Sequence, residues 1–198
     1  MSSRPFRVTD EDAAYDLMYG VMGGEYDYMR GCALAAEGRY YSARMAFEVS
    51  GFGDWEERAQ ACIQPWPETG ELYSNSEVYG DITALCVVFN GTPDTAMLVK
   101  IYTVDGVLAR TMFIGGSGSA TTYLPEGVYI IKDGAGEEWY GEQEAFGADG
   151  YYEIMTFDDD VQEVLLEGYY ITTITVNVQE SNPDGKGVGS DAETWENF

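Results

Sequence analysis

One short stretch of the sequence combines carboxylates, aromatic rings and glycines: GEEWYGEQEAFG, residues 136–147. Its candidate ligand-binding residues are Glu138, Trp139, Tyr140, Glu142 and Phe146. Rings flanked by carboxylates are typical of sites that bind or cleave sugars. The alternative is an aromatic plug, in which the glycines let the loop fold back and bury its rings at one end of a β-sandwich. We favour the plug, because buried aromatic side chains outnumber binding platforms in proteins.

The acidic stretch NPDGKGVGSDAE, residues 182–193, is a candidate calcium site. The residues at ligand positions of a calcium-binding loop are Asn182, Asp184, Ser190 and Glu193. Gly187 falls at the turn, but Lys186 stands where an oxygen ligand belongs, and no flanking helix is evident. A solvated acidic tail is therefore the favoured interpretation, and no cofactor other than calcium is indicated.

Histidine is absent from the sequence, which excludes Ser-His-Asp and Cys-His catalysis and most zinc sites. Cys32, Cys62 and Cys86 are widely spaced and match no zinc or redox motif. Each lies in an apolar pattern, so we predict three buried thiols and a reducing compartment. Since no phosphate-binding loop, dinucleotide fingerprint or nucleophile elbow occurs either, an enzyme is the disfavoured class.

The formal net charge of -25, from 35 acidic and 10 basic residues, restricts the partners. Phosphates would be repelled, which disfavours nucleic acid and anionic membrane surfaces. A cationic partner, bound cations or a high-salt setting fits better, and a very soluble surface is the favoured interpretation. The start of the chain lacks an apolar leader and no run is long enough to span a membrane, so we expect a soluble chain. Its compartment stays open between the cytoplasm and a longer envelope-associated protein.

The first third of the sequence matches itself at an offset of 30 residues. The matching pairs are Ala13 and Ala43, Leu17 and Phe47, Gly23 and Gly53, and Cys32 and Cys62. Apolar residues at helical spacing predict a two-helix unit in each copy, so residues 10–64 form helical repeats. We place the break of the first copy at Gly23–Gly24. In the second copy, Gly51–Gly53 ends one helix and Asp54 is the N-cap of the next.

The segment from Glu37 to Cys62 reads EGRYYSARMAFEVSGFGDWEERAQAC. It resembles a tetratricopeptide-type repeat at Gly38, Tyr40, Ala43, Phe47, Gly53 and Asp54. The resemblance implies either a peptide-binding groove or a structural spacer, and we favour the spacer because two hairpins give little concave surface. Three or more repeats usually bury a continuous core. The helical region is therefore expected to pack against the β-domain, a second subunit or further repeats.

From residue 81 onward the sequence predicts β-structure. Residues 65–80 form a proline-containing linker, in which Trp66 tucks into the seam between domains. The predicted strands are 82–89, 97–104, 107–114, 120–124, 128–131, 153–157 and 169–178. The Asp105-Gly106 turn is a strong hairpin signal. Short strands with regular turns predict a β-sandwich over residues 81–180, and a flexible acidic tail follows at 181–198.

The run LPEGVYIIKDGAGEEWYGEQEAFGADGYY, Leu124 to Tyr152, contains a Pro-Glu-Gly turn followed by Gly-x-x-Trp-Tyr-Gly and Phe-Gly motifs. It resembles a domain that recurs in bacterial proteins, which implies a β-sandwich and an association with envelope or sensing proteins but supplies no catalytic residues. The run ATTYLPEGVYII also resembles Cna B-type sandwiches. That resemblance implies a lysine–asparagine crosslink beside a carboxylate, for which Lys100, Asn177 and Glu153 are the candidates. The favoured alternative is that Lys100 lies on a solvated face of its strand.

Together these observations predict an α+β chain, with tetratricopeptide-like helical hairpins before an immunoglobulin-like or prealbumin-like sandwich. The favoured function is a non-enzymatic interaction or assembly module that binds a protein, a peptide or a second copy of itself. The rival is a carbohydrate-binding or calcium-dependent ligand-binding domain that uses the loop of Trp139 and Tyr140. Neither nucleic acid binding nor membrane insertion is expected.

Overall fold

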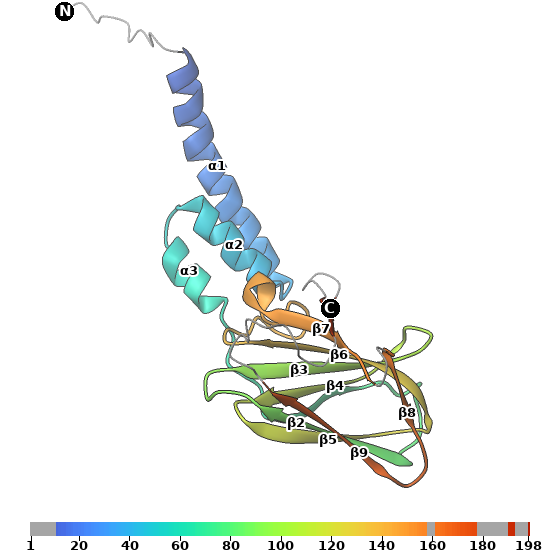
Figure 1. Cartoon of the computed structure of the whole chain (residues 1–198). Coiled ribbons are helices and arrows are strands. Elements are labelled where there is room, and N and C mark those ends of the chain that lie inside the picture. Colours follow the sequence, from blue (N-terminus) through green and yellow to red (C-terminus); the bar gives the residue numbers. More distant parts are fainter. Residues whose placement is uncertain (1–10, 158–160, 178–189, 193–197) are drawn as a thin grey trace, which may run out of the picture. The chain divides into compact units, whose positions relative to one another are not determined.

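The computed structural model describes residues 11–157, 161–177, 190–192 and 198. The chain divides into two compact units, Met1–Ile63 and Gln64–Phe198. Of the described residues, those in the first unit form helices and those in the second form mainly β-sheets (Figure 1). The α+β class, with a helical part before a β-rich part, is as predicted. No described helix combines the length and the apolar character that a membrane span requires.

The helical unit contains α1 (Glu11–Ala36), α2 (Tyr40–Ser50) and α3 (Trp55–Ala61). The predicted break at Gly23–Gly24, and with it the first of two hairpins, is wrong, because α1 continues through both glycines. Glycine in a helix interior costs only about 1 kcal/mol relative to alanine. Here close packing accompanies it, since a Cβ added at Gly24 would stand 2.6 Å from the carbonyl oxygen at the end of α2.

The two helices predicted between residues 37 and 62, and the glycine turn between them, are found as α2 and α3. α2 ends at Gly51, which adopts a left-handed conformation with a φ of 54°, and α3 begins directly after Asp54. Ala43 and Phe47 of α2 are buried. The Phe47 ring fills the space left open by Gly31 of α1, where an added Cβ would lie 2.7 Å from the ring.

Asp54 stands at the N-cap position of α3 but does not cap the helix through its side chain. Its carboxylate instead accepts a hydrogen bond from the Tyr28 hydroxyl and pairs with Arg58 at 3.2 Å. The Tyr28 hydrogen bond, and after it Arg58, holds the pKa of Asp54 below its ordinary value. The carboxylate therefore links α3 to α1 rather than closing the end of its own helix.

The second unit is built from two β-sheets that face each other (Figure 1). The larger sheet has the strand order β1-β4-β3-β6-β7-β10, with β8 also paired to β6. Its strands are β1 (Gly70–Ser74), β3 (Ala96–Thr103), β4 (Leu108–Gly115), β6 (Gly127–Gly136), β7 (Tyr151–Met155), β8 (Glu163–Leu166) and β10 (Ser190–Ala192). The smaller sheet has the order β5-β2-β9. Its strands are β2 (Thr83–Asn90), β5 (Gly118–Leu124) and β9 (Ile171–Asn177), and a short 3-10 helix, η1 (Gly147–Asp149), precedes β7.

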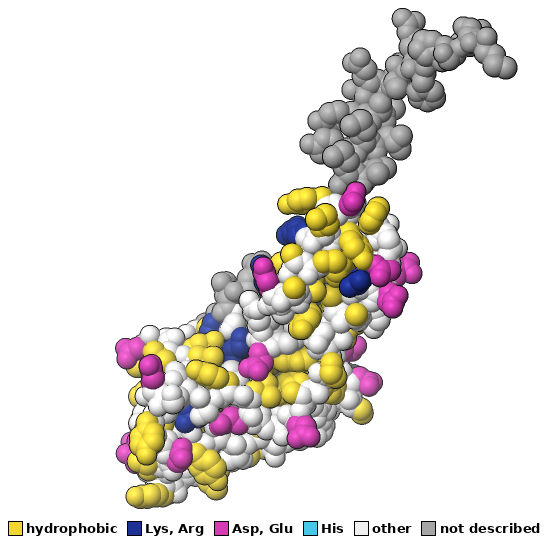
Figure 2. Space-filling model, turned by 180° about the vertical axis from the view of Figure 1, so that it is seen from behind, with side chains coloured by type: hydrophobic (Ala, Val, Ile, Leu, Met, Phe, Trp, Pro, Cys, Tyr) yellow, Lys and Arg dark blue, Asp and Glu magenta, His cyan; other side chains and the backbone are white. Residues whose placement is uncertain are grey.

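The core of this unit lies between the two sheets. Met97 and Val99 of β3 face Leu85 and Val87 of β2 across it, and all four are fully buried. The intervening Leu98 points to the opposite face of the larger sheet, where a second apolar cluster forms. The larger sheet is therefore buried on both faces, which explains why β3 reads as an unbroken apolar run instead of alternating. Hydrophobic side chains also reach the surface of the unit, between acidic ones (Figure 2).

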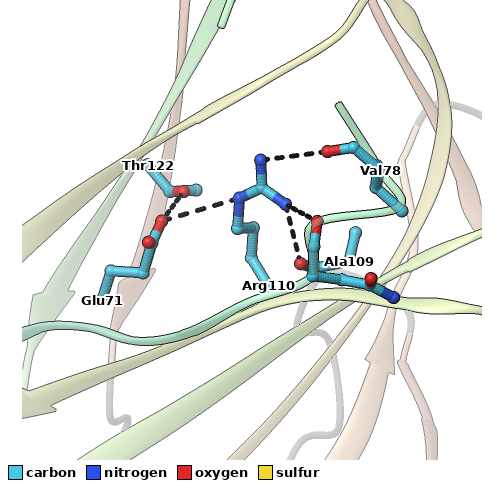
Figure 3. A network of polar contacts seen from close by, with 6 residues as sticks. Glu71, Val78, Ala109, Arg110 and Thr122 are labelled. Carbon is cyan, nitrogen blue, oxygen red and sulfur yellow. Dashed lines mark hydrogen bonds and ion pairs between the residues drawn. The ribbon is translucent and has the colours of Figure 1, made fainter. Parts of the chain in front are cut away.

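A polar network around one buried arginine joins the two sheets beside β1 (Figure 3). Arg110 of β4 is almost fully buried, and its Nε lies 3.7 Å from the Glu71 carboxylate of β1. The same carboxylate accepts a hydrogen bond from the Thr122 hydroxyl of β5. The guanidinium group also donates to the carbonyl oxygens of Asn75, Val78 and Ala109. Because the buried guanidinium group of Arg110 has a partly exposed carboxylate and three carbonyl oxygens as partners, the network holds β1 and β5 against β4.

The strands predicted at 82–89, 97–104 and 107–114 are found as β2, β3 and β4, and the Asp105-Gly106 turn joins the last two. β1 lies inside the predicted linker, 65–80, so that segment is part of the β-unit. β10 likewise lies in the predicted flexible tail. Both strands pair with partners distant in sequence, and strand formation that depends on such pairing leaves a weak local pattern.

Asp133 is a carboxyl group inside the apolar core. It lies on β6 opposite Val99, with only 2% of its surface exposed, and its Oδ1 has no hydrogen-bond partner among the described residues. Burial, and after it the Glu153 carboxylate opposite on β7, raises the pKa of Asp133 well above its ordinary value. The protonated side chain is therefore the form that the fold accommodates.

Replacing Asp133 by asparagine should stabilise the protein in a pH-dependent manner. Because its folded-state pKa is raised, the stability contributed by the protonated group is fully present below the unfolded pKa of about 3.8 and is lost as pH rises through the folded pKa. Asp133→Asn avoids this loss, so it should melt a few degrees above the wild type at pH 8 and at nearly the same temperature at pH 4.

Thermal melts followed by circular dichroism between pH 4 and pH 8 measure this difference. Asp105→Asn is the control, because it makes the same replacement at an exposed position in a turn. A difference between Asp133→Asn and the wild type that stays constant with pH would contradict the assignment.

Candidate functional site

The loop that follows β6 covers the outer face of the larger sheet, the face that points away from the smaller sheet. Its Trp139 and Phe146 rings are buried, with centroids 5.4 Å apart. Trp139 packs on Phe113 of β4 at 5.0 Å, and Trp66 packs on the same ring at 6.2 Å. The Trp66 indole N–H also donates to the Glu137 carbonyl oxygen at 3.1 Å. Trp66, predicted in a seam between domains, is thus a member of an aromatic cluster on the β-unit.

Short backbone hydrogen bonds give this loop its shape. The Tyr140 N–H donates to the Ala145 carbonyl oxygen at 2.7 Å, and the Ala145 N–H donates to the Gly141 carbonyl oxygen at 2.8 Å. Gly141 has a φ of 87°, in the left-handed region that favours glycine. The Tyr152 hydroxyl then accepts a hydrogen bond from the Phe146 N–H at 3.0 Å. The loop is therefore closed on itself and tied to β7.

The five predicted ligand-binding residues lie together in this loop, but their rings turn inward. Only 4% of Trp139, 1% of Tyr140 and 2% of Phe146 is exposed, so no ligand can stack on these rings as they lie. The Tyr140 hydroxyl donates to Glu138 at 2.6 Å, and Glu142 stays at the surface. The loop is an aromatic cover, but it lies on a face of the sandwich rather than at one end, because an outward-facing phenylalanine on β4 needs covering.

Most of the predicted calcium loop lies outside the described residues, which include neither Asn182 nor Asp184 nor Glu193. Ser190 begins β10 and pairs with Met155 of β7. In the part of the chain that the structure describes, no group of three or more acidic or cysteine side chains could hold a metal ion.

The candidate crosslink between Lys100 and Asn177 is excluded, because the two residues lie in different sheets. Lys100 is on β3 of the larger sheet and Asn177 on β9 of the smaller one. The side-chain oxygen of Asn177 accepts a hydrogen bond from Asn90 at 2.8 Å. Glu153, the predicted acid, pairs with Asp133 instead.

None of the three cysteines forms a disulfide, and only part of their predicted burial is found. Cys62 is buried, whereas Cys32 and Cys86 are partly exposed. Cys86 alternates on β2 with the core residues Leu85 and Val87, so it belongs to the outer face of the smaller sheet.

That outer face is an exposed surface with a defined shape. Ala84 and Cys86 of β2 form a floor of small side chains. Tyr123 of β5 lies opposite Ala84 on one side, and Tyr169 and Tyr170 precede β9 on the other. Together they line a shallow groove of about 470 Å³. We call this surface the tyrosine face; its large side chains are Ile82, Tyr123, Tyr169, Tyr170 and Ile171.

The rings of the tyrosine face project from a backbone that is held in place. The Tyr170 carbonyl oxygen accepts hydrogen bonds from the Ala84 N–H and the Thr83 hydroxyl, both at 3.2 Å. Nevertheless 93% of Tyr169, 75% of Tyr170 and 56% of Tyr123 is exposed. A cluster of large side chains left in water on an ordered sheet is typical of an interaction surface.

Sequence reasoning placed the candidate site at the other aromatic cluster. A signal for the tyrosine face exists in the adjacent Tyr169-Tyr170 pair at the start of a strand, since two neighbouring rings on a strand cannot both face the core. Comparison of the chain with known protein families, with curated proteins and with solved structures finds no match. The function of the chain is therefore inferred from the geometry and chemistry of these surfaces.

The two aromatic clusters should respond differently to truncation. Trp139→Ala removes a buried ring and should lower the free energy of unfolding by about 3–5 kcal/mol. Tyr169→Ala removes an exposed ring and should change it by less than about 0.5 kcal/mol. Denaturation in urea followed by circular dichroism measures both values. Equal losses in the two variants would mean that Trp139 does not support the fold as the structure places it.

Proposed function

We propose that this chain is a non-enzymatic protein-interaction module and that the tyrosine face binds its partner. The observation that carries the proposal is the exposure of Tyr123, Tyr169 and Tyr170 beside a backbone held by β2. Tyrosine is enriched at protein interfaces because it offers a large contact area with few rotatable bonds. Rings presented in this way lose little conformational freedom when a partner covers them.

The charge of the surface indicates a basic partner. Asp81 lines the groove, and the described residues that line it include no lysine or arginine. The whole chain has a formal net charge of -25. Arginine and lysine side chains bind both to carboxylates and over the faces of tyrosine rings. The partner that fits is therefore an extended segment of another protein that carries these residues.

The edge of the smaller sheet offers a way to align such a segment. β9 pairs with β2, and no second strand among the described residues pairs with it. Its seven residues carry no charge, although exposed edge strands usually carry charges that prevent further pairing. An extended segment added at this edge would turn every second side chain toward the side on which the tyrosine face lies.

We also propose a specific fold for each of the two units. We infer that the helical unit is a degenerate tetratricopeptide-like hairpin, supported by the packing of Ala43 and Phe47 in its core. We infer an immunoglobulin-like or prealbumin-like sandwich for the β-unit, supported by two sheets around one core. Because α1 is one long helix, the helical unit has one hairpin instead of two, which favours a spacer over a binding groove.

The rival function, a carbohydrate-binding or calcium-dependent domain that uses the Trp139 and Tyr140 loop, has less support because both rings are buried. Sugars can nevertheless stack on exposed tyrosine rings. Oligosaccharides are therefore included as competitors in the test of the proposed function.

A nine-residue peptide of alternating arginine and valine should bind the full chain at the tyrosine face. We expect a dissociation constant of about 10–100 µM at low salt, weakened about fivefold at 300 mM salt because screening reduces the attraction. Tyr123→Ser and Tyr170→Ser should each weaken binding about tenfold. Fluorescence anisotropy of the labelled peptide measures these affinities.

Tyr151→Ser is the matched control, because Tyr151 is an exposed tyrosine on β7, outside the tyrosine face. It should leave the affinity unchanged. Equal affinity for a peptide of alternating glutamate and valine would contradict the proposal. Binding of an oligosaccharide at the same tyrosines, without binding of the basic peptide, would support the rival function instead.

A further inference from the structure

A later segment of the chain docks onto the larger sheet at two described points. β10 pairs antiparallel with β7, with Ser190 opposite Met155 and Ala192 opposite Glu153. Phe198 is buried, with 8% of its surface exposed. A peptide ligand that adds a strand to a sheet edge and anchors one side chain in a pocket makes the same two kinds of contact. The segment therefore occupies what is, in chemical terms, a peptide site.

Phe198 lies in a pocket on the outer face of the larger sheet, which we call the aromatic slot. The residues that form the aromatic slot are Lys100, Tyr102, Gly134 and Tyr152. The Phe198 and Tyr152 ring centroids are 4.9 Å apart, and Lys100 Nζ lies 4.3 Å from the Phe198 centroid. The Tyr102 hydroxyl donates to the backbone oxygen of Phe198 at 3.2 Å. A Cβ added at Gly134 would lie 2.6 Å from the Tyr152 ring and 3.3 Å from the tip of the Phe198 ring, so glycine makes room for both rings.

The aromatic slot is a positive spot on a strongly negative chain. Lys100 and Lys132 lie opposite each other on β3 and β6, in a chain with 10 basic and 35 acidic residues. Burial, and after it Lys132, lowers the pKa of Lys100 to about 8, while Glu142 acts in the opposite direction. Residues 190–198, SDAETWENF, carry acidic side chains and no basic one. The slot therefore fits an acidic segment anchored by an aromatic residue.

We propose that the β7 edge and the aromatic slot also bind β10 and Phe198 of a second copy of this chain, so that copies exchange these two elements. Every copy carries both the segment and its site, and the contacts are the same whether they form within one chain or between two. Residues 178–189 separate β9 from β10, and a chain of this length spans up to about 40 Å when fully extended.

Concentration decides between the two arrangements. Docking within one chain has an effective concentration in the millimolar range, so exchange prevails when copies are crowded or when docking within the chain is disabled. This proposal rests on the interaction and assembly role proposed above, but it uses a different surface from the tyrosine face. The two proposals can therefore fail independently.

Two full-length variants with complementary defects test the exchange. Phe198→Ala leaves the aromatic slot intact but removes the anchor that fills it. Lys100→Glu leaves the segment intact but places a negative charge in its slot. Each variant alone should be monomeric at 100 µM, whereas an equal mixture should form a heterodimer with a dissociation constant of about 10–100 µM. Sedimentation velocity measures the species present.

The controls separate exchange from other association. A mixture in which both chains carry Phe198→Ala should remain monomeric, and Tyr123→Ser in both chains should leave the heterodimer unchanged. If Lys100→Glu melts far below the wild type, Lys100→Gln replaces it in the same mixture. A mixture of folded variants that stays monomeric up to 1 mM would overturn the proposal. A heterodimer that persists when both chains lack the Phe198 ring would overturn it as well.

Discussion

The larger sheet is apolar on both faces, and most of the β-unit follows from that constraint. Met97 and Val99 of β3 turn to one side, and Leu98 between them turns to the other. The smaller sheet covers the first side, and the Trp139 loop covers the second. Each buried aromatic ring removes on the order of 150–250 Å² from water, which corresponds to several kcal/mol at about 25 cal/mol per Å². A loop that carries three rings can therefore replace a third layer of secondary structure.

The same constraint explains where exposed surface remains. The smaller sheet has three strands and lies on one face of a sheet with seven. Its inner residues pack in the core that the two sheets share, and no described element of the β-unit covers its outer face. The small side chains of Ala84 and Cys86 keep the apolar area of that face low in the middle, while tyrosines at its margins tolerate water through their hydroxyl groups. Such a surface can stay in solution and still bind.

Whether a feature could be predicted depended on how far apart in the sequence the residues that determine it lie. The hairpin at Asp105-Gly106 was predictable because its turn and both strands are adjacent in sequence. The break expected at Gly23–Gly24 is not found, because the packing of α1 on α2 outweighs the low helix propensity of glycine. The burial of Trp139 was predictable from its area, but the face it covers depends on the side to which Phe113 turns on a distant strand. Predicting the tyrosine face would require knowing which face of β2 packs into the core.

The few basic residues of the chain show how its charge is arranged. Arg110 is buried against Glu71, Arg44 and Arg58 pair along their helices with Glu48 and Asp54, and Lys100 lies in the aromatic slot. These cations are engaged locally, so the acidic excess acts outward over the remaining surface. Copies approaching through their tyrosine faces would repel each other, whereas a basic partner would be attracted. At the aromatic slot the sign is reversed, and an acidic segment of the chain itself becomes a suitable ligand.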